Sequence, residues 1–217
     1  TRWLSDWSSD VCSSDLNTLA ATTDGSLAFT NSKALTVGTV GGVNGVTSTG
    51  DDISLTATTG NLSIAQAVTT GGTTAGNIAL SAADTGGSII RTTAAGSLTA
   101  NGLVATAGKD VLLTMPNDPQ NVLAGDLFDM AHANNVVKLA GKATNGRFAY
   151  ADISEIEIDT LAGVSGIEAQ SIWVRVKEQM LVNQQIKATG TDRNTIVLAV
   201  EANNYADVNS GKFINNA

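Results

Sequence analysis

The residues best suited to bind a metal ion lie in one short segment, Asp126-Leu-Phe-Asp129-Met-Ala-His132. This segment holds the only histidine of the chain and two carboxylates, which could converge if the segment turned once. Zinc and other transition metals take three or four such ligands. No further ligand lies nearby in the sequence, so we interpret the segment as a solvated loop. The sequence predicts neither a metal site nor a cofactor.

A second candidate chemistry is cleavage of a sugar chain, for which Asp51-Asp52 and Asp110 are the acidic residues to consider. Glycosidases place two carboxylates on either side of the bond that breaks. Here the aspartates directly precede short apolar segments, where a carboxylate can accept hydrogen bonds from nearby backbone N–H groups. Residues 17–116 contain only five acidic side chains. We therefore expect no catalytic groove and no enzyme.

A third candidate is a binding surface in residues 155–177. Isoleucines alternate with acidic residues over 155–159, and apolar residues alternate with Trp173, Arg175 and Lys177 over 172–177. If the two segments stack as neighbouring strands, opposite charges line up across the sheet and stabilise it. The alternative interpretation is an exposed contact patch of Trp173, Arg175 and Lys177, because Trp and Arg are enriched among binding hot spots.

The elements that must position these residues belong to a long internal repeat, in which residues 25–80 return at residues 146–198. Gly25-Ser-Leu27-Ala-Phe29 matches Gly146-Arg-Phe148-Ala-Tyr150, and Ile53-Ser-Leu55 matches Ile172-Trp-Val174. The copies lie 118–121 residues apart, and their apolar positions are kept while the residues between them change. Stacked repeats that bury one continuous core have this pattern.

Apolar-x-apolar pairs recur through residues 17–116 and predict strands of three to five residues. Most of them follow a glycine, which adopts corner conformations that other residues avoid. Spacings of 18 residues from Leu35 to Ile53 and 25 from Ile53 to Ile78 predict coils of roughly 18–25 residues. The predicted fold class is all-β, a single-stranded parallel β-helix (β-solenoid) whose super-repeat spans five or six coils. The pairs are Leu27/Phe29, Leu35/Val37, Ile53/Leu55, Leu62/Ile64, Ile78/Leu80 and Val111/Leu113.

The chain divides into two regions. Residues 1–16 are set aside as a non-native segment, because residues 5–16 resemble a translated sequencing adapter. Residues 17–217 form the predicted β-solenoid, with an irregular excursion at about 115–132, where Met115-Pro-Asn-Asp-Pro119 interrupts the strand pattern. We expect the native start and end of the protein to lie outside this chain.

Composition excludes several classes of protein. Without residues 1–16 no cysteine remains, which excludes a disulfide scaffold and a thiolate metal site. The acidic residues then fall from 20 to 17 and the basic ones from 12 to 11. This mild acidity argues against nucleic acid as a partner, which needs a basic surface. No stretch of 18 apolar residues is present, so the sequence predicts no transmembrane segment.

The strings Gly60-Asn-Leu-Ser-Ile64 and Gly76-Asn-Ile-Ala-Leu80, and the run from Ala34 to Val46, resemble the repeats of filamentous haemagglutinin-type adhesins. The resemblance covers most of residues 17–202. It implies a right-handed β-helix shaft that an outer-membrane transporter of the two-partner type exports to the surface of a Gram-negative cell or into the medium. The implied partners are host-cell or glycan receptors or neighbouring bacteria. It assigns a functional role to no residue of this chain.

The expected function is therefore that of a non-enzymatic repeat shaft of a large adhesin, supporting attachment, aggregation or biofilm formation. Two alternatives share the same shaft. An autotransporter passenger would be fused to a carboxy-terminal barrel, and a contact-dependent toxin-delivery stalk would carry a toxin at its far end. A carbohydrate-active β-helix enzyme is a further alternative, which an Asp cluster on adjacent coils would support.

Overall fold

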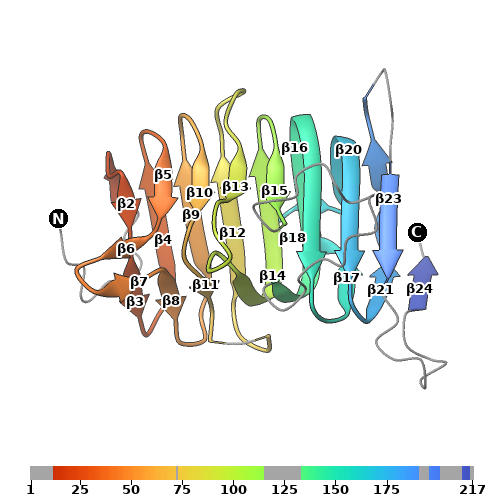
Figure 1. The fold of residues 1–217 in the computed structure, drawn as a ribbon, viewed down its shortest axis with the longest axis horizontal. Coiled ribbons are helices and arrows are strands. Elements are labelled where there is room, and N and C mark those ends of the chain that lie inside the picture. The colour runs from red at the N-terminus through yellow and green to blue at the C-terminus, as the bar shows by residue number, and fades with distance from the viewer. Residues whose placement is uncertain (1–11, 72, 115–132, 191–195, 201–211, 216–217) are drawn as a thin grey trace.

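The computed structural model describes residues 12–71, 73–114, 133–190, 196–200 and 212–215. Within these ranges the chain is all-β, as predicted: twenty strands join one large sheet, and four more form two short antiparallel pairs. Figure 1 shows the strands of the large sheet side by side along the long axis, from the red amino-terminal end to the blue carboxy-terminal end. The described part of the chain contains no helix that could cross a membrane.

The parallel strands of the large sheet fall into three ladders. The first contains β1 (Cys12–Ser14), β4 (Leu27–Asn31), β9 (Ile53–Ala57), β12 (Asn77–Ala82), β14 (Leu98–Ala107), β16 (Asn135–Asp152), β20 (Ile167–Val176) and β22 (Ile186–Ala188). The second contains β2 (Thr18–Leu19), β5 (Leu35–Val37), β10 (Leu62–Ile64), β13 (Ile89–Arg91), β15 (Val111–Leu113), the later parts of β16 and β20, and β23 (Ile196–Val200). The third contains β3 (Ala21–Thr23), β8 (Val46–Ser48), β11 (Val68–Thr69), the first residues of β14 and β16, β17 (Ile156–Ile158), β21 (Gln179–Val182) and β24 (Lys212–Asn215).

The chain visits the three ladders in turn, so strands that follow one another in sequence lie in different ladders. Ile53 pairs with Ile78, 25 residues on, as the sequence predicts. Leu35, however, pairs with Leu62, 27 residues on, and not with a residue near Ile53. The 18-residue spacing from Leu35 to Ile53 is the distance along the chain from a strand of the second ladder to a strand of the first. It is not a full return to the same ladder. The large parallel sheet is compatible with a β-solenoid.

The apolar-x-apolar pairs point into the core. All twelve side chains of the six predicted pairs are at most 7 % exposed. They stack in columns, such as the one formed in the second ladder by Leu35, Leu62, Ile89, Val111, Phe148 and Ile172. A single cluster of buried side chains extends from Leu19 to Val182. Each of the larger ones contributes roughly 1.5–3 kcal/mol by leaving water.

The two copies of the super-repeat occupy different ladders. β5 lies in the second ladder, but its sequence match, β17, lies in the third. Between them the chain returns to the second ladder four times, at β10, β13, β15 and β16. The predicted five or six coils per super-repeat are therefore wrong. One super-repeat contains four full returns to the same ladder plus the step to the next ladder. Matching strands of the two copies therefore lie on different sides of the structure.

Two antiparallel hairpins recur with the same local conformation, one in each copy of the super-repeat. Each ends in a glycine with positive φ, 71° at Gly45 and 66° at Gly166. A Cβ at Gly45 would lie 2.1 Å from the carbonyl oxygen of Ala67, and one at Gly166 would lie 2.0 Å from that of Gln185. The sequence match at these glycines therefore reflects a steric requirement. The hairpins are β6 (Thr39–Val40) with β7 (Val43–Asn44), and β18 (Thr160–Leu161) with β19 (Val164–Ser165).

Candidate functional site

Two of the three aspartates considered for sugar chemistry, Asp52 and Asp110, accept hydrogen bonds from the backbone. Asp52 Oδ1 accepts one from the N–H of Asn77 at 2.7 Å, and Asp110 Oδ1 accepts one from the N–H of Arg147 at 2.8 Å. Asp52 directly precedes β9, and Asn77 is the first residue of β12, the next strand of the first ladder. Asp110 directly precedes β15, and Arg147 lies within β16, just before its paired residues in the second ladder. Asp52 and Asp110 therefore join consecutive strands, which confirms their predicted role at corners.

The metal candidates Asp126, Asp129 and His132 lie outside the described residues, together with the predicted excursion at 115–132. Among the side chains that the structure places, no three His, Cys, Asp or Glu residues gather closely enough to hold a metal ion. Among the described residues, the remaining candidate for a functional site is the outer surface of the sheet.

The acidic strand and the strand that contains Trp173 do not stack on each other. β17, which carries Glu157, pairs with β16 and β21. Trp173 in β20 lies instead between Ala149 of β16 and Val197 of β23. The prediction that the charges of residues 155–159 pair with those of 172–177 is therefore wrong. The two segments are neighbours in sequence and for that reason lie in different ladders.

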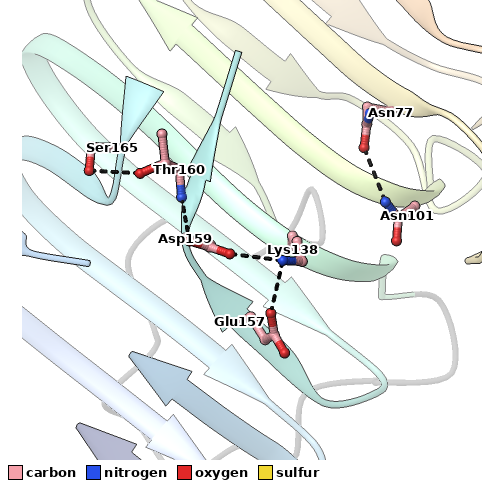
Figure 2. Close-up of polar contacts among 7 residues, drawn as sticks. All are labelled: Asn77, Asn101, Lys138, Glu157, Asp159, Thr160 and Ser165. Atoms are coloured by element: carbon pink, nitrogen blue, oxygen red, sulfur yellow. Dashed lines mark hydrogen bonds and ion pairs between the residues drawn. The ribbon is translucent and has the colours of Figure 1, made fainter. Parts of the chain in front are cut away.

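Lys138 of β16 is the partner of the acidic strand instead. Its Nζ lies 3.3 Å from Glu157 Oε2 and 2.8 Å from Asp159 Oδ2, as Figure 2 shows. Hydrogen bonds to Asp159 and Glu157 raise the pKa of Lys138, and the bond from Lys138 lowers the pKa of Asp159. The three side chains are 25–36 % exposed, so solvent screens these pairs and their contribution to stability is small.

Glu168 of β20 lies between two lysines of neighbouring strands. Its carboxylate is 3.0 Å from Nζ of Lys142 in β16 and 3.3 Å from Nζ of Lys187 in β22. The bond from Lys142, followed by that from Lys187, lowers the pKa of Glu168. Charges of opposite sign therefore alternate along this outer row of the first ladder, which supports the parallel register.

Trp173, Arg175 and Lys177 point outward from β20 and from the residues after it, as the alternation predicts. The apolar residues between them, Ile172, Val174 and Val176, are at most 1 % exposed. The guanidinium carbon of Arg147 lies 5.7 Å from the centroid of the Trp173 ring, which is a cation–π distance. We call Arg147, Trp173, Arg175 and Lys177 the Trp173 surface.

The outward row that contains Trp173 changes chemistry along the second ladder. In register it runs Thr18, Thr36, Ser63, Ile90, Leu112, Ala149, Trp173 and Val197. The first three positions carry hydroxyl groups and the last five are apolar. The matching row of the first ladder stays polar throughout, with hydroxyl groups at Thr30, Thr56, Ser81 and Thr106 and charged groups at Lys142, Glu168 and Lys187. The apolar outward row is thus a property of one ladder in its carboxy-terminal part.

Sequence reasoning missed three charged residues that the fold places in notable positions. Arg147 contacts Trp173 from the neighbouring strand, and it occupies the position of Ser26 in the first copy. Arg91 and Asp152 are 2 % and 0 % exposed. The period-two alternation could have found both, because Arg91 follows Ile89 and Asp152 follows Tyr150 on the inward side.

Comparisons with known proteins give no match for the chain. No family model, no curated protein and no solved structure matches it. Its function must therefore be argued from the fold and the surface.

Proposed function

We propose that the chain is a segment of a right-handed, single-stranded parallel β-helix that serves as the repeat shaft of a large bacterial adhesin. The observation that supports this proposal is a single core that runs from Leu19 to Val182 beneath outward rows of varying chemistry. An array of this kind gains length by adding strands that contact only their neighbours. It suits a protein that must hold a binding surface away from a cell.

In this proposal the parent protein is of the filamentous haemagglutinin type and lies outside the Gram-negative outer membrane, on the cell surface or released. An outer-membrane transporter of the two-partner type carries it there. Support comes from the repeat style of Gly60–Ile64 and Gly76–Leu80, whose leucines and isoleucines, Leu62, Ile64, Ile78 and Leu80, all enter the core. Attachment to host cells, aggregation and biofilm formation are the activities that such a shaft supports.

We place the receptor contact of this segment on the Trp173 surface. The Trp173 indole has the Arg147 guanidinium carbon 5.7 Å from its ring centroid, and Arg175 and Lys177 follow it on the outward side of the chain. This face therefore offers apolar area, a cation–π pair and cationic groups. Central aromatic and arginine side chains carry most of the binding energy in protein interfaces. In the same row, the partly exposed Val197 on the neighbouring strand extends this surface, whereas Ala149 on the other side of Trp173 is only 1 % exposed. The receptor is a glycan or protein on a host cell or on a neighbouring bacterium.

Replacing both Trp173 and Arg175 with alanine should weaken binding of the purified chain to cells by about tenfold or more. The effect arises because the indole and one of its neighbouring cations are removed while the inward residues of β20 stay in place. Binding of fluorescently labelled protein to cultured epithelial cells and to suspended Gram-negative bacteria measures it, with circular dichroism and thermal melting as checks of folding.

The matched control is the double variant Thr30→Ala and Thr56→Ala, which alters an outward row of the first ladder. It should bind like the unchanged chain. If the Trp173 variant is folded and binds as well as the control, the contact does not lie on this surface. If the unchanged chain binds neither kind of cell, this segment carries no adhesive surface of its own.

A further inference from the structure

A buried carboxylate occupies the corner at the end of β16. Asp152 is 0 % exposed, and its Oδ2 accepts hydrogen bonds from the Tyr150 hydroxyl at 2.6 Å and the Val136 N–H at 3.0 Å. Its Oδ1 accepts bonds from the N–H and the hydroxyl of Ser154 at 2.9 and 2.8 Å. Four donors thus face one carboxylate, which offsets a large part of the cost of burying it.

Asn134, the bridge partner of Asp152 in the sheet, extends this network to other strands. Its Nδ2 donates to the carbonyl oxygens of Leu113 at 2.8 Å and Ala151 at 3.0 Å, and its Oδ1 accepts from the N–H of Leu98 at 3.0 Å. The two polar side chains therefore fasten β14, β15, the start of β16 and the corner that follows β16. We call this network the Asp152 corner.

We infer that the Asp152 corner is a proton-binding latch, in which the buried Asp152 takes up one proton while its hydrogen-bond network stays closed. With the carboxylate charged, the Tyr150 hydroxyl donates to it. Once Oδ1 has bound a proton from solvent, its O–H can donate to the Ser154 hydroxyl oxygen, and the hydrogen of that hydroxyl turns to Asn135 Oδ1, 3.1 Å away. The Tyr150 hydroxyl keeps donating to Oδ2. The N–H of Val136 still donates to Oδ2, and the N–H of Ser154 still donates to Oδ1. The inference does not depend on the proposed function.

The acid–base properties of the pair agree with this geometry. Burial raises the pKa of Asp152 from 3.8 to about 6, against the opposing effect of its hydrogen bonds from Tyr150 and Ser154. Burial and the neighbouring Asp152 charge raise the pKa of Tyr150 well above its ordinary value. Tyr150 therefore keeps its proton throughout, and Asp152 is the group that titrates.

Other charged groups surround the pair from the strands packed against it. Arg91 of β13 opposes the rise in the pKa of Tyr150, and its guanidinium is held by the carbonyl oxygens of Thr93 and Ala94. Arg175 of β20 and Lys177, the residue after β20, flank Val176, the register partner of Asp152, and point outward. Glu155, at the corner, is exposed.

The sign of the pH dependence follows from the raised pKa. Between the ordinary pKa of an aspartate and about 6, the folded chain binds a proton that the unfolded chain does not, so stability rises as the pH falls. This group should lower the unfolding equilibrium constant about tenfold between pH 7 and pH 5. Asp159 and Glu168, whose pKa values are lowered, lose their contributions only in stronger acid.

The direct test follows the Asp152 carboxyl carbon by NMR in the full chain labelled with ¹³C-aspartate, assigned through the Asp152→Asn variant. The expected midpoint is near pH 6, and Tyr150→Phe should raise it by about one unit because a donor to the charged form is lost. Urea unfolding at pH 7 and pH 5 should show the tenfold change in the unfolding equilibrium constant for the unchanged chain but not for Asp152→Asn. The control Asp110→Asn should keep it.

Two results would overturn the latch. One is a midpoint at or below pH 4 for Asp152 in the unchanged chain. The other is faster hydrogen exchange at the Val136 and Ser154 amides at pH 5 than the intrinsic rates explain, which would mean that protonation opens the corner. If Asp152→Asn does not fold, Tyr150→Phe and the two amide measurements still decide the matter.

Discussion

Replacing Gly166 with alanine should lower the free energy of unfolding by about 3 kcal/mol or more. The residue has a φ of 66°, and an added Cβ would lie 2.0 Å from the carbonyl oxygen of Gln185. That oxygen also accepts the hydrogen bond from the N–H of Ile167 at 3.1 Å. The clash is therefore with the backbone of the neighbouring strand, which cannot turn aside as a side chain would. Urea unfolding followed by circular dichroism measures the loss.

Gly163 provides the matched control within the same hairpin. Its φ is 82°, but a Cβ there would have no atom within 4 Å. Gly163→Ala should therefore cost only about 1 kcal/mol, the penalty of the left-handed conformation itself. The same contrast is expected between Gly45 and Gly42 in the first hairpin. Equal losses of unfolding free energy for Gly163→Ala and Gly166→Ala would contradict the close approach of Gly166 to the backbone of Gln185.

Truncating Phe148 to alanine should destabilise the chain by about 3–5 kcal/mol. The ring is fully buried in the core column of the second ladder, between Val111 and Ile172. Gly141 leaves room for it, because a Cβ at that glycine would lie 2.2 Å from Cε2 of the ring. The cavity would remain largely unfilled, since the strands on either side are held by their backbone hydrogen bonds. Urea unfolding of the purified variant measures the change.

Phe148→Leu is the control for this change, because leucine occupies the matching position, Leu27, in the first copy of the repeat. It should cost about 1.5 kcal/mol or less, since most of the apolar volume is kept. A loss below about 1 kcal/mol for Phe148→Ala would place the ring outside the core. That outcome would contradict the inward direction of the whole column.

The direction of the side chains could be predicted from the sequence because a strand alternates strictly between two faces. This rule placed Leu27 and Phe29 in the core and Trp173 on the outside, and the structure agrees. It depends only on the nearest neighbours in the chain. The buried positions of Arg91 and Asp152 follow from the same rule, but charged side chains are seldom fully buried, so their residue types argue against these positions.

The pairing of the strands could not be predicted in the same way. The distance from Leu35 to Ile53 resembles a full return, yet Leu35 pairs with Leu62. Strands of the other two ladders, similar in composition, lie between register partners, and nothing in their apolar pattern says which ladder each one joins. Register is decided by the corners, through hydrogen bonds such as that from the N–H of Asn77 to Asp52. Those contacts join residues that are far apart in the sequence.

Only part of the candidate surface could be predicted from the sequence, because the pairing of strands could not be predicted. Trp173, Arg175 and Lys177 share one strand and its extension, so alternation alone places them together. Arg147 joins them only because the later part of β16 pairs with β20. The ion pairs of Glu157 and Asp159 with Lys138 likewise cross between strands, which is why the sequence assigned these acids the wrong partner.

The parallel stacking on which the whole account depends is tested most directly by a designed disulfide. Thr56 and Ser81 are register partners on adjacent strands and both point outward, so their Cα atoms lie about 4.8 Å apart, within disulfide range. With Cys12 replaced by serine, the pair Thr56→Cys and Ser81→Cys should oxidise almost completely, and mass spectrometry of the digested protein should identify the link. The pair Thr56→Cys and Ser63→Cys, which an antiparallel hairpin of β9 and β10 would bring together, should stay reduced. The opposite pattern would contradict the parallel ladders.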